Sequence, residues 1–290
     1  MLRPDPINKL KKYFSQRQEI LMAFLFGSRI KKSESSHSDW DVGVYFKPDS
    51  KYLEWEEKIF YPQENQIWQD LERILKSEVD FVVLNRAPAS TTFSILSSGL
   101  PLVIKDRGIY LDLLNKISYE AIDFRNFIYD FWQIKQRAHS ISEVDKARIL
   151  KTLDFLSTEV QDFEKFQSLT WLEYQDDRPK RREVERWIEN IVNATLDIAK
   201  IILASEKKDI PETYQETLRV LGTTSFFEPS FSERISQWAK LRNILAHQYL
   251  DLKWEQIDRF IHKAGQDFVV FVEKIKSIFS LTFRKEKGKP

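Results

Sequence analysis

The fold of the first hundred residues is decided by the stretch Ile20-Leu21-Met22-Ala23-Phe24-Leu25-Phe26-Gly27-Ser28 and, after ten further residues, by Asp39-Trp40-Asp41. The seven apolar residues have the length of a buried strand and stop at a glycine. Asp39 and Asp41 stand two apart, so both carboxylates project from one face if the segment is a strand. The stretch therefore predicts two strands, with a glycine turn after the first and a pair of acids on the second.

This pattern also predicts a site for phosphate and metal. We expect Gly27 and Ser28 to open a helix, where backbone N–H groups and a hydroxyl favour a phosphate. Asp80, at the start of a later strand, would bring a third carboxylate beside Asp39 and Asp41. Clustered carboxylates repel one another unless a divalent cation lies between them, and phosphoryl-type transfer uses such ligands to hold Mg²⁺ on a triphosphate. The three aspartates are therefore the candidate metal ligands.

The hydrophobic pattern changes near Asp106. Before it, further strands are expected at 42–46, 79–84 and 100–104, with helices at 7–18, 52–76 and 88–99. After it, apolar residues recur at helical spacing over 109–138, 143–167, 180–205, 228–249 and 255–279. The sequence thus predicts a small α/β domain at 1–138 and an all-helical domain at 141–283. The polar break His139-Ser140-Ile141-Ser142 is the expected hinge.

The helical half carries a second polar pattern, Arg242-Asn243-Ile244-Leu245-Ala246-His247-Gln248-Tyr249. Metal-free RNA cleavage needs a proton shuttle near neutral pH, which histidine supplies, and a cation for the phosphate, which arginine supplies. Arg242 and His247 lie about 140° apart around a straight helix, so one helix does not direct both at one point. Either the helix deforms near its end, or a second copy of the chain completes the site. Arg242 and Tyr249 fall on nearly one face.

Composition limits the partners of the chain. Its 290 residues include 45 basic and 44 acidic side chains and no cysteine. The balanced charge gives no overall field that would attract RNA, so any RNA contact needs a local basic patch. The lack of cysteine excludes disulfides and thiolate metal sites and suits a cytoplasmic protein. No secretory leader is visible, and the apolar runs are far shorter than the roughly 20 residues that cross a bilayer. We therefore expect no membrane partner.

The first half resembles the polymerase-β-like nucleotidyltransferases, and among them the minimal nucleotidyltransferases. The resemblance rests on the Gly-Ser pair, on the two acids that follow it and on the later strand that begins with Val79-Asp80. It implies that Gly27, Ser28 and Arg29 bind ATP, that Asp39 and Asp41 are catalytic ligands of Mg²⁺, and that Asp80 is the base or third ligand.

The second half is similar to the HEPN toxins of the HepT type. The similarity rests on the segment 238–252, which contains the R-x4-H-x-Y pattern, and on the helical stretch 186–203 before it. Members of that family are dimeric RNases with the arginine and histidine at a dimer cleft. In paired toxin–antitoxin systems, the minimal nucleotidyltransferase adds AMP to the motif tyrosine. By resemblance, Arg242 and His247 would be catalytic, Tyr249 would be modified, and a homodimer would form through the HEPN domain.

Together the two resemblances imply an α/β polymerase-β-like nucleotidyltransferase domain followed by an all-α HEPN bundle. The predicted function is a fused toxin–antitoxin protein, in which a Mg²⁺-dependent transferase uses ATP to adenylylate Tyr249 and so restrains a metal-independent RNase. Two alternatives remain open. An antibiotic nucleotidyltransferase of the aminoglycoside type also joins an α/β domain to a helical bundle, but it gives no role to Arg242, His247 or Tyr249. A non-catalytic nucleotide sensor is the other alternative.

Overall fold

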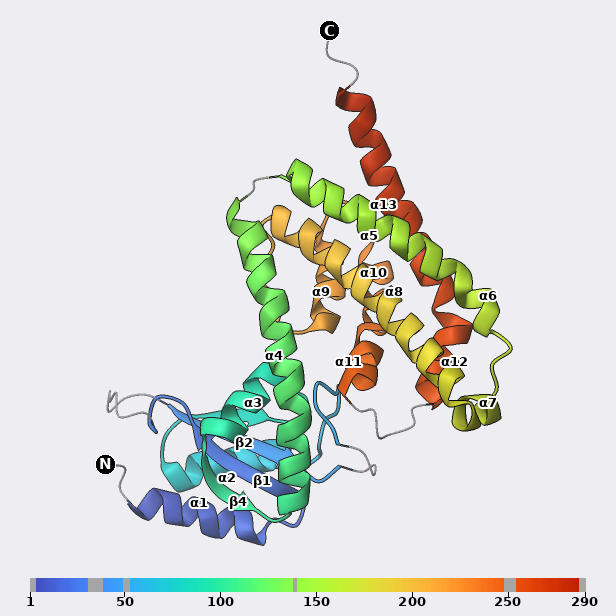
Figure 1. Cartoon of the computed structure of the whole chain (residues 1–290). Helices are drawn as coiled ribbons and strands as arrows, with labels where there is room; N and C mark the ends of the chain where they lie inside the picture. Colours follow the sequence, from blue (N-terminus) through green and yellow to red (C-terminus); the bar gives the residue numbers. More distant parts are fainter. Residues whose placement is uncertain (1–3, 31–38, 49–52, 138–139, 248–253, 287–290) are drawn as a thin grey trace. The chain divides into compact units, whose positions relative to one another are not determined.

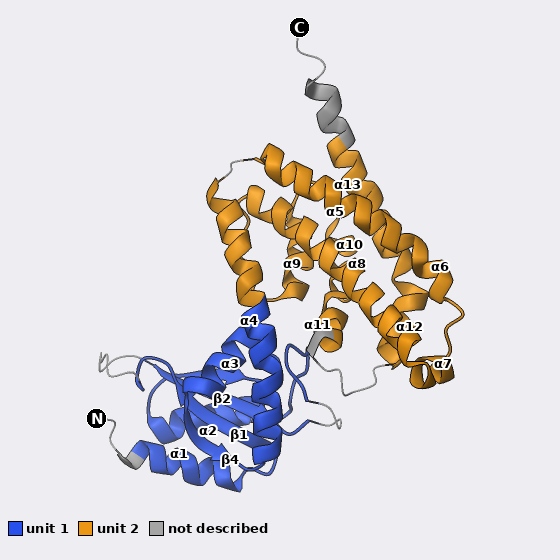
Figure 2. Ribbon diagram, in the orientation of Figure 1, with its two compact units in different colours: residues 1–123 blue, residues 124–290 orange. Residues whose placement is uncertain are grey.

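The structure is a computed structural model of the whole chain, and it describes residues 4–30, 39–48, 53–137, 140–247 and 254–286 (Figure 1). Its contacts divide the chain into two compact units, residues 1–123 and 124–290 (Figure 2). Within the described residues, no helix has both the length and the apolar character needed to cross a membrane. The expected fold class is confirmed, because an α/β unit precedes an all-helical one.

The first unit is built on a four-stranded sheet with the order β3-β2-β1-β4. The strands are β1 (Ile20–Phe26), β2 (Trp40–Phe46), β3 (Val79–Val83) and β4 (Leu100–Ile104). Strand β1 pairs antiparallel with β2 and β4, whereas β2 and β3 are parallel. Each strand begins and ends within two residues of its predicted position. This agreement follows from the strong apolar runs, which are bounded by glycine, proline and polar residues.

Helices cover both faces of this sheet because β1 and β2 are apolar on both sides. The helices of the unit are α1 (Pro4–Gln16), α2 (Glu64–Leu75), α3 (Ala89–Ser98) and the first part of α4 (Arg107–Arg137). One core cluster joins α1 and α2 to the strand residues Ile20, Ala23 and Leu25. A second cluster joins α3 and α4 to Met22 and Phe24, which alternate along the strand with Ala23 and Leu25.

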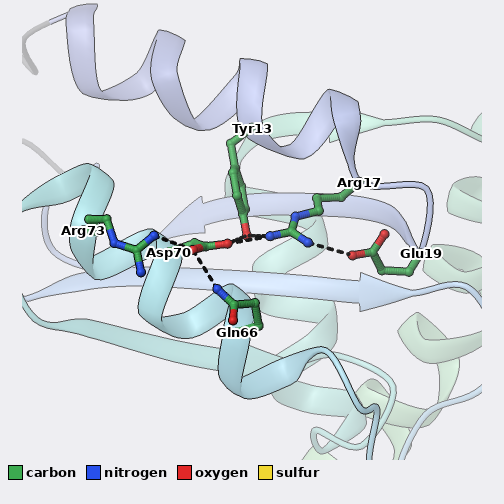
Figure 3. A network of polar contacts seen from close by, with 6 residues as sticks. All are labelled: Tyr13, Arg17, Glu19, Gln66, Asp70 and Arg73. Atoms are coloured by element: carbon green, nitrogen blue, oxygen red, sulfur yellow. Dashed lines mark hydrogen bonds and ion pairs between the residues drawn. The ribbon is translucent and has the colours of Figure 1, made fainter.

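A network of polar contacts fastens α1 to α2 (Figure 3). Its centre is the buried Asp70, which accepts hydrogen bonds from Tyr13 at 2.8 Å and from Arg17 at 2.5 Å. Gln66 and Arg73 donate to the other carboxylate oxygen, at 3.0 and 2.9 Å. Burial alone would raise the pKa of Asp70, but the hydrogen bonds from Tyr13 and Gln66 and the charges of both arginines outweigh it and lower the pKa. The network therefore holds a charged carboxylate between the two helices.

The expected helix at 52–76 was wrong in its first half, because only Glu64–Leu75 is helical. The described residues 53–63 form neither helix nor strand. Side chains satisfy this segment instead: the Glu54 N–H donates to the Tyr45 hydroxyl at 2.9 Å, and the Glu54 carboxylate accepts from Tyr61 and the buried Asn85. Tyr45 and Asn85 lie outside this segment, so the apolar spacing within 52–63 does not reveal their contacts.

The second unit is an all-helical bundle around the long helix α8 (Arg178–Ser205). One large buried cluster joins its helices. The remaining elements are α5 (Glu143–Glu159), η1 (Val160–Asp162), α6 (Phe163–Phe166), α7 (Trp171–Asp176), α9 (Tyr214–Val220), η2 (Leu221–Thr223), α10 (Pro229–Ser236), α11 (Ala239–His247), α12 (Trp254–Lys263) and α13 (Gly265–Glu286).

The predicted helix 143–167 is divided into α5, η1 and α6, and two further predicted helices of this unit are divided as well. The stretch 228–249 becomes α10 and α11, separated at Gln237 and Trp238. At this break, the indole N–H of Trp238 donates to the buried carboxylate of Asp267 on α13 at 3.1 Å. The contact holds the residues between α10 and α11 against another helix. The stretch 255–279 becomes α12 and α13, separated at Ala264. Single-sequence periodicity continues across both breaks and does not mark them.

The boundary between the units differs from the hinge expected at 139–142. It falls inside α4, between residues 123 and 124. The last part of α4 places Phe124, Phe127, Phe131 and Ile134 in the buried cluster of the helical unit, so this unit begins before the helix ends. Residues 138–139, at the expected hinge, lie outside the described residues.

Candidate functional site

The first candidate site is the edge of the sheet at which β2 and β3 begin. The parallel register pairs Asp41 with Asp80, and Asp41 also lies opposite Phe26 at the end of β1. The carboxylate of Asp41 rests against Gly27, where an added Cβ would lie 1.9 Å from Asp41 Oδ2. Gly27 also has a φ of +80°, a conformation that favours glycine. Glycine is therefore required here for both backbone shape and space.

The acids of this site influence one another electrostatically. Burial raises the pKa of Asp41, and the charges of Asp80 and Asp39 raise it further, whereas Arg29 opposes them. Asp39 and Asp80 are exposed, and Asp41 is half-buried. The structure thus brings together the three predicted aspartates and Arg29. The three acids give this edge a negative charge, which Arg29 partly offsets. The edge is accessible to water because Asp39 and Asp80 are exposed.

Trp40 holds Arg29 at this edge. The guanidinium carbon of Arg29 lies 4.5 Å from the centre of the Trp40 ring, within the range of a cation–π contact. Trp40 is itself buried in the core beneath the sheet edge. The sequence analysis assigned no role to this tryptophan, although its place between the two aspartates was a signal.

The helix expected to begin at Gly27-Ser28 does not begin there. Ser28 is exposed and forms a turn with Arg29 and Ile30, and residues 31–38 lie outside the described part. A phosphate at this turn would meet backbone N–H groups without the support of a helix that starts at Ser28.

The donor chemistry of the edge fits a hard divalent cation. Asp39, Asp41 and Asp80 offer only oxygen atoms, and a cation would relieve the repulsion that raises the pKa of Asp41. In the described part of the chain, however, no three His, Cys, Asp or Glu side chains already converge in a metal-binding arrangement. The three acids are close enough to interact but are not gathered around one point.

The second candidate site is Arg242 on α11. Its Nε donates to Asn193 Oδ1 of α8 at 2.9 Å, and its Nη1 donates to Asn243 Oδ1 at 3.2 Å. Its guanidinium carbon lies 4.7 Å from the centre of the Tyr214 ring. Three side chains from three helices therefore fix the direction of this cation. His247 ends the same helix, but its side chain and the whole of Tyr249 lie outside the described residues.

Asn193 and Tyr214 are the residues of this site that the sequence analysis missed. Asn193 lies outside the apolar stripe of α8, on the side that carries exposed arginines, so the helical periodicity does not mark it. Tyr214 is buried, and its ring meets Phe124 and Phe127 edge-on at 4.9 and 5.0 Å. Its aromatic character alone predicts only a core residue, because the contact with the arginine depends on the packing of α9 against α11.

Comparisons with known proteins match both halves. Residues 8–108 match the family model described as Polymerase beta, Nucleotidyltransferase, and residues 156–275 match the model described as Ribonuclease HepT-like. The tRNA nuclease HepT of Aphanizomenon flos-aquae (strain 2012/KM1/D3) is 25% identical over 146 residues, which cover 50% of this chain and 99% of that protein. The mRNA nuclease HepT of Shewanella oneidensis is 23% identical over 90 residues, which cover 31% of this chain and 68% of that protein.

Proposed function

We propose that this chain, in which a polymerase-β-type nucleotidyltransferase region precedes a HepT-like ribonuclease region, is a fused toxin–antitoxin protein. Its first half would adenylylate Tyr249 and so restrain the RNase of its second half. The supporting observation is that one chain joins the Asp41–Asp80 edge, packed on Gly27, to a HepT-like helix with a fixed Arg242. An antibiotic nucleotidyltransferase would leave the HepT-like match without a role.

The transfer would proceed by displacement at the α-phosphorus of ATP. The phenolic oxygen of Tyr249 forms a bond to that phosphorus, the bond to the bridging oxygen breaks, and pyrophosphate leaves with the electron pair. Asp80 is the candidate acceptor of the phenolic proton. Asp39 and Asp41 would hold Mg²⁺, which supplies charge neutralisation at the triphosphate. Arg29, held over a tryptophan ring, would bind phosphate oxygens.

In the RNase half, Arg242 would stabilise the charge that develops on the scissile phosphate, and His247 would transfer protons. Side chains five positions apart on a helix point about 140° away from each other. We therefore propose a homodimer in which a second copy of the chain completes the cleft that needs both Arg242 and His247. The two relatives are named for tRNA and mRNA, so RNA is the substrate class that we assign.

Intact-mass analysis tests the transfer. The full chain is first treated with a phosphodiesterase to remove any AMP already attached, and is then incubated with ATP and Mg²⁺. We expect the mass to increase by whole AMP units and peptide mapping to place them on Tyr249. If a protein that binds ATP gains no mass, the transferase proposal fails. If AMP is found only on other residues, Tyr249 is not the acceptor.

A second experiment tests the role given to Arg242. We expect Asn193→Ala to lower the RNase kcat of the AMP-free protein by about 10- to 100-fold. The variant removes a hydrogen bond to a charged group, worth about 1.5–3 kcal/mol, and each 1.36 kcal/mol corresponds to about tenfold in rate. The KM for RNA should change less than kcat, because the cation remains but loses its fixed direction.

The matched control for this variant is Asn190→Ala on the same helix. Asn190 donates instead to Glu159 Oε2 at 3.0 Å, so this variant removes a hydrogen bond to a different charged partner. Thermal melts of both variants separate a loss of stability from a loss of rate. Equal kcat values for the two variants would show that Asn193 does not position Arg242.

A further inference from the structure

Three arginines form a row along the first half of α8: Arg178, Arg182 and Arg186. All three are exposed, and the Arg186 side chain is 72% accessible. A spacing of four residues places successive members about 6 Å apart along the axis and about 40° apart around it. The arginine row therefore lies on one face of the helix.

Three glutamates of α8 near the arginine row are already engaged, and Asp177, just before the row, caps the helix through the Lys180 N–H. Glu183 pairs with Lys165 at 2.5 Å, Glu185 accepts from the Tyr174 hydroxyl at 2.6 Å, and Glu189 pairs with Arg186 at 3.1 Å. Neither Arg178 nor Arg182 has an ion-pair partner within the described ranges. Two charges of the row are thus uncompensated by the surrounding protein.

Helix stability does not explain the arginine row. The N-terminus of a helix carries partial positive charge, so cations there are unfavourable and acids are preferred. The N-cap Asp177, whose side chain accepts from the Lys180 N–H at 3.0 Å, meets this preference. Arg178, the first residue of the helix, opposes it, so the helix dipole does not account for an arginine at this end of the row.

The arginine row lies on the same side of α8 as Asn193, the residue that contacts Arg242. Asn193, which accepts from Arg242 Nε at 2.9 Å, lies about 60° around the helix from Arg178 and roughly 10 Å along the axis from Arg186. This angle falls within the arc covered by the row itself. Arg242 is therefore held on the same side of α8 as the three arginines.

The other end of the motif segment is also held close to the arginine row. Trp254 is the first described residue after the motif, and its ring centre lies 5.5 Å from that of Tyr174. The Tyr174 hydroxyl donates to Glu185, which immediately precedes Arg186 on α8. Arg242, at the start of the motif, thus contacts α8 at Asn193, and Trp254, after the motif, is linked to α8 through Tyr174 and Glu185. Arg186 lies on α8 between these two positions.

We propose that the arginine row binds the phosphate backbone of the RNA cut at Arg242. The inference rests on the proposed RNase function and adds a binding surface for its substrate. Arginine suits this role because its guanidinium donates two parallel hydrogen bonds to a phosphate. A local surface is needed because the whole chain carries a net charge of only +1. Arg178 and Arg182 bind phosphates of the RNA strand. Arg186 binds a further phosphate in place of its exposed ion pair with Glu189.

The test measures RNA binding against salt concentration. The full AMP-free chain with His247→Ala, which cannot cut, is titrated with a fluorescent single-stranded RNA. Changing all three row arginines to glutamine should weaken binding and reduce the slope of log K against log salt by about 2, since each phosphate contact contributes about 0.7 for a single strand. Changing the same residues to lysine should restore most of the slope because the charges return.

The matched control changes Lys9, Lys11 and Lys12 of α1 to glutamine. These lysines are exposed, and their replacement removes the same number of positive charges from the other unit. The slope should therefore equal that of the chain carrying His247→Ala alone. If the row variant and the lysine control bind RNA alike, the arginine row is not the binding surface, even though the wild-type chain cuts RNA. If the AMP-free wild-type chain neither binds nor cuts RNA, the proposed RNase function itself fails.

Discussion

Replacing Asp39 and Asp41 together by asparagine is expected to reduce transfer of label from α-phosphate-labelled ATP to the protein by at least about 10²- to 10³-fold. Both side chains keep their size but lose the charges proposed to hold Mg²⁺. The carboxylate of Asp41 lies directly against Gly27, so its position is defined by the close packing at this turn. Label incorporation over time, with ATP and Mg²⁺ in excess, measures the effect.

The stability of this double variant separates chemistry from folding. Burial and the charges of Asp80 and Asp39 raise the pKa of Asp41, so its ionised form is unfavourable in the folded protein. Removing the charge should therefore leave the melting temperature unchanged or higher. A control with Asp112→Asn and Glu72→Gln loses two charges from helices of the same unit. Transfer by the double variant at the rate of this control would reject Asp39 and Asp41 as the metal ligands.

The sequence predicted the elements that strong local patterns define. The strand Ile20–Phe26 begins and ends as predicted, because its apolar residues continue up to Gly27. Gly27 ends the strand in a turn whose positive φ favours glycine. The pairing of Asp41 with Asp80 was also predictable, since two acids at the starts of neighbouring strands meet at one edge. These inferences depend on spacing along the chain.

What the sequence did not predict depends on contacts between distant residues. In the irregular segment 53–63, polar groups of Glu54 form hydrogen bonds with Tyr45 and Asn85, which lie elsewhere in the chain. The break at Trp238 depends on Asp267, and the direction of Arg242 depends on Asn193. Periodicity within a segment is unaffected by such partners. It therefore identified helical regions but missed the irregular stretch 53–63, the breaks within predicted helices and the residues that support the site.

Tyr249→Phe is expected to release the RNase in cells that express the chain with Asp39 and Asp41 intact. The variant keeps the aromatic ring but lacks the oxygen that would accept AMP. On a straight helix, positions 242 and 249 lie within about 20° of each other, so an AMP ester on Tyr249 would bring one negative phosphodiester to the side of Arg242. That phosphate would pair with the Arg242 guanidinium that RNA needs, and the adenosine would fill the cleft. Loss of the AMP group should therefore raise RNase activity by at least an order of magnitude.

Growth of the host after induction, together with total RNA integrity, measures this release. The Asp39→Asn/Asp41→Asn chain should be equally harmful, because it leaves Tyr249 unmodified by a different route. Adding Arg242→Ala should make either variant harmless, since it removes the cation that Asn193, Asn243 and Tyr214 hold in place. Harmless Tyr249→Phe, combined with a wild-type chain that carries no AMP in the same cells, would mean that adenylylation does not control this RNase. Harm that persists after Arg242→Ala would place the toxic activity outside the α11 site.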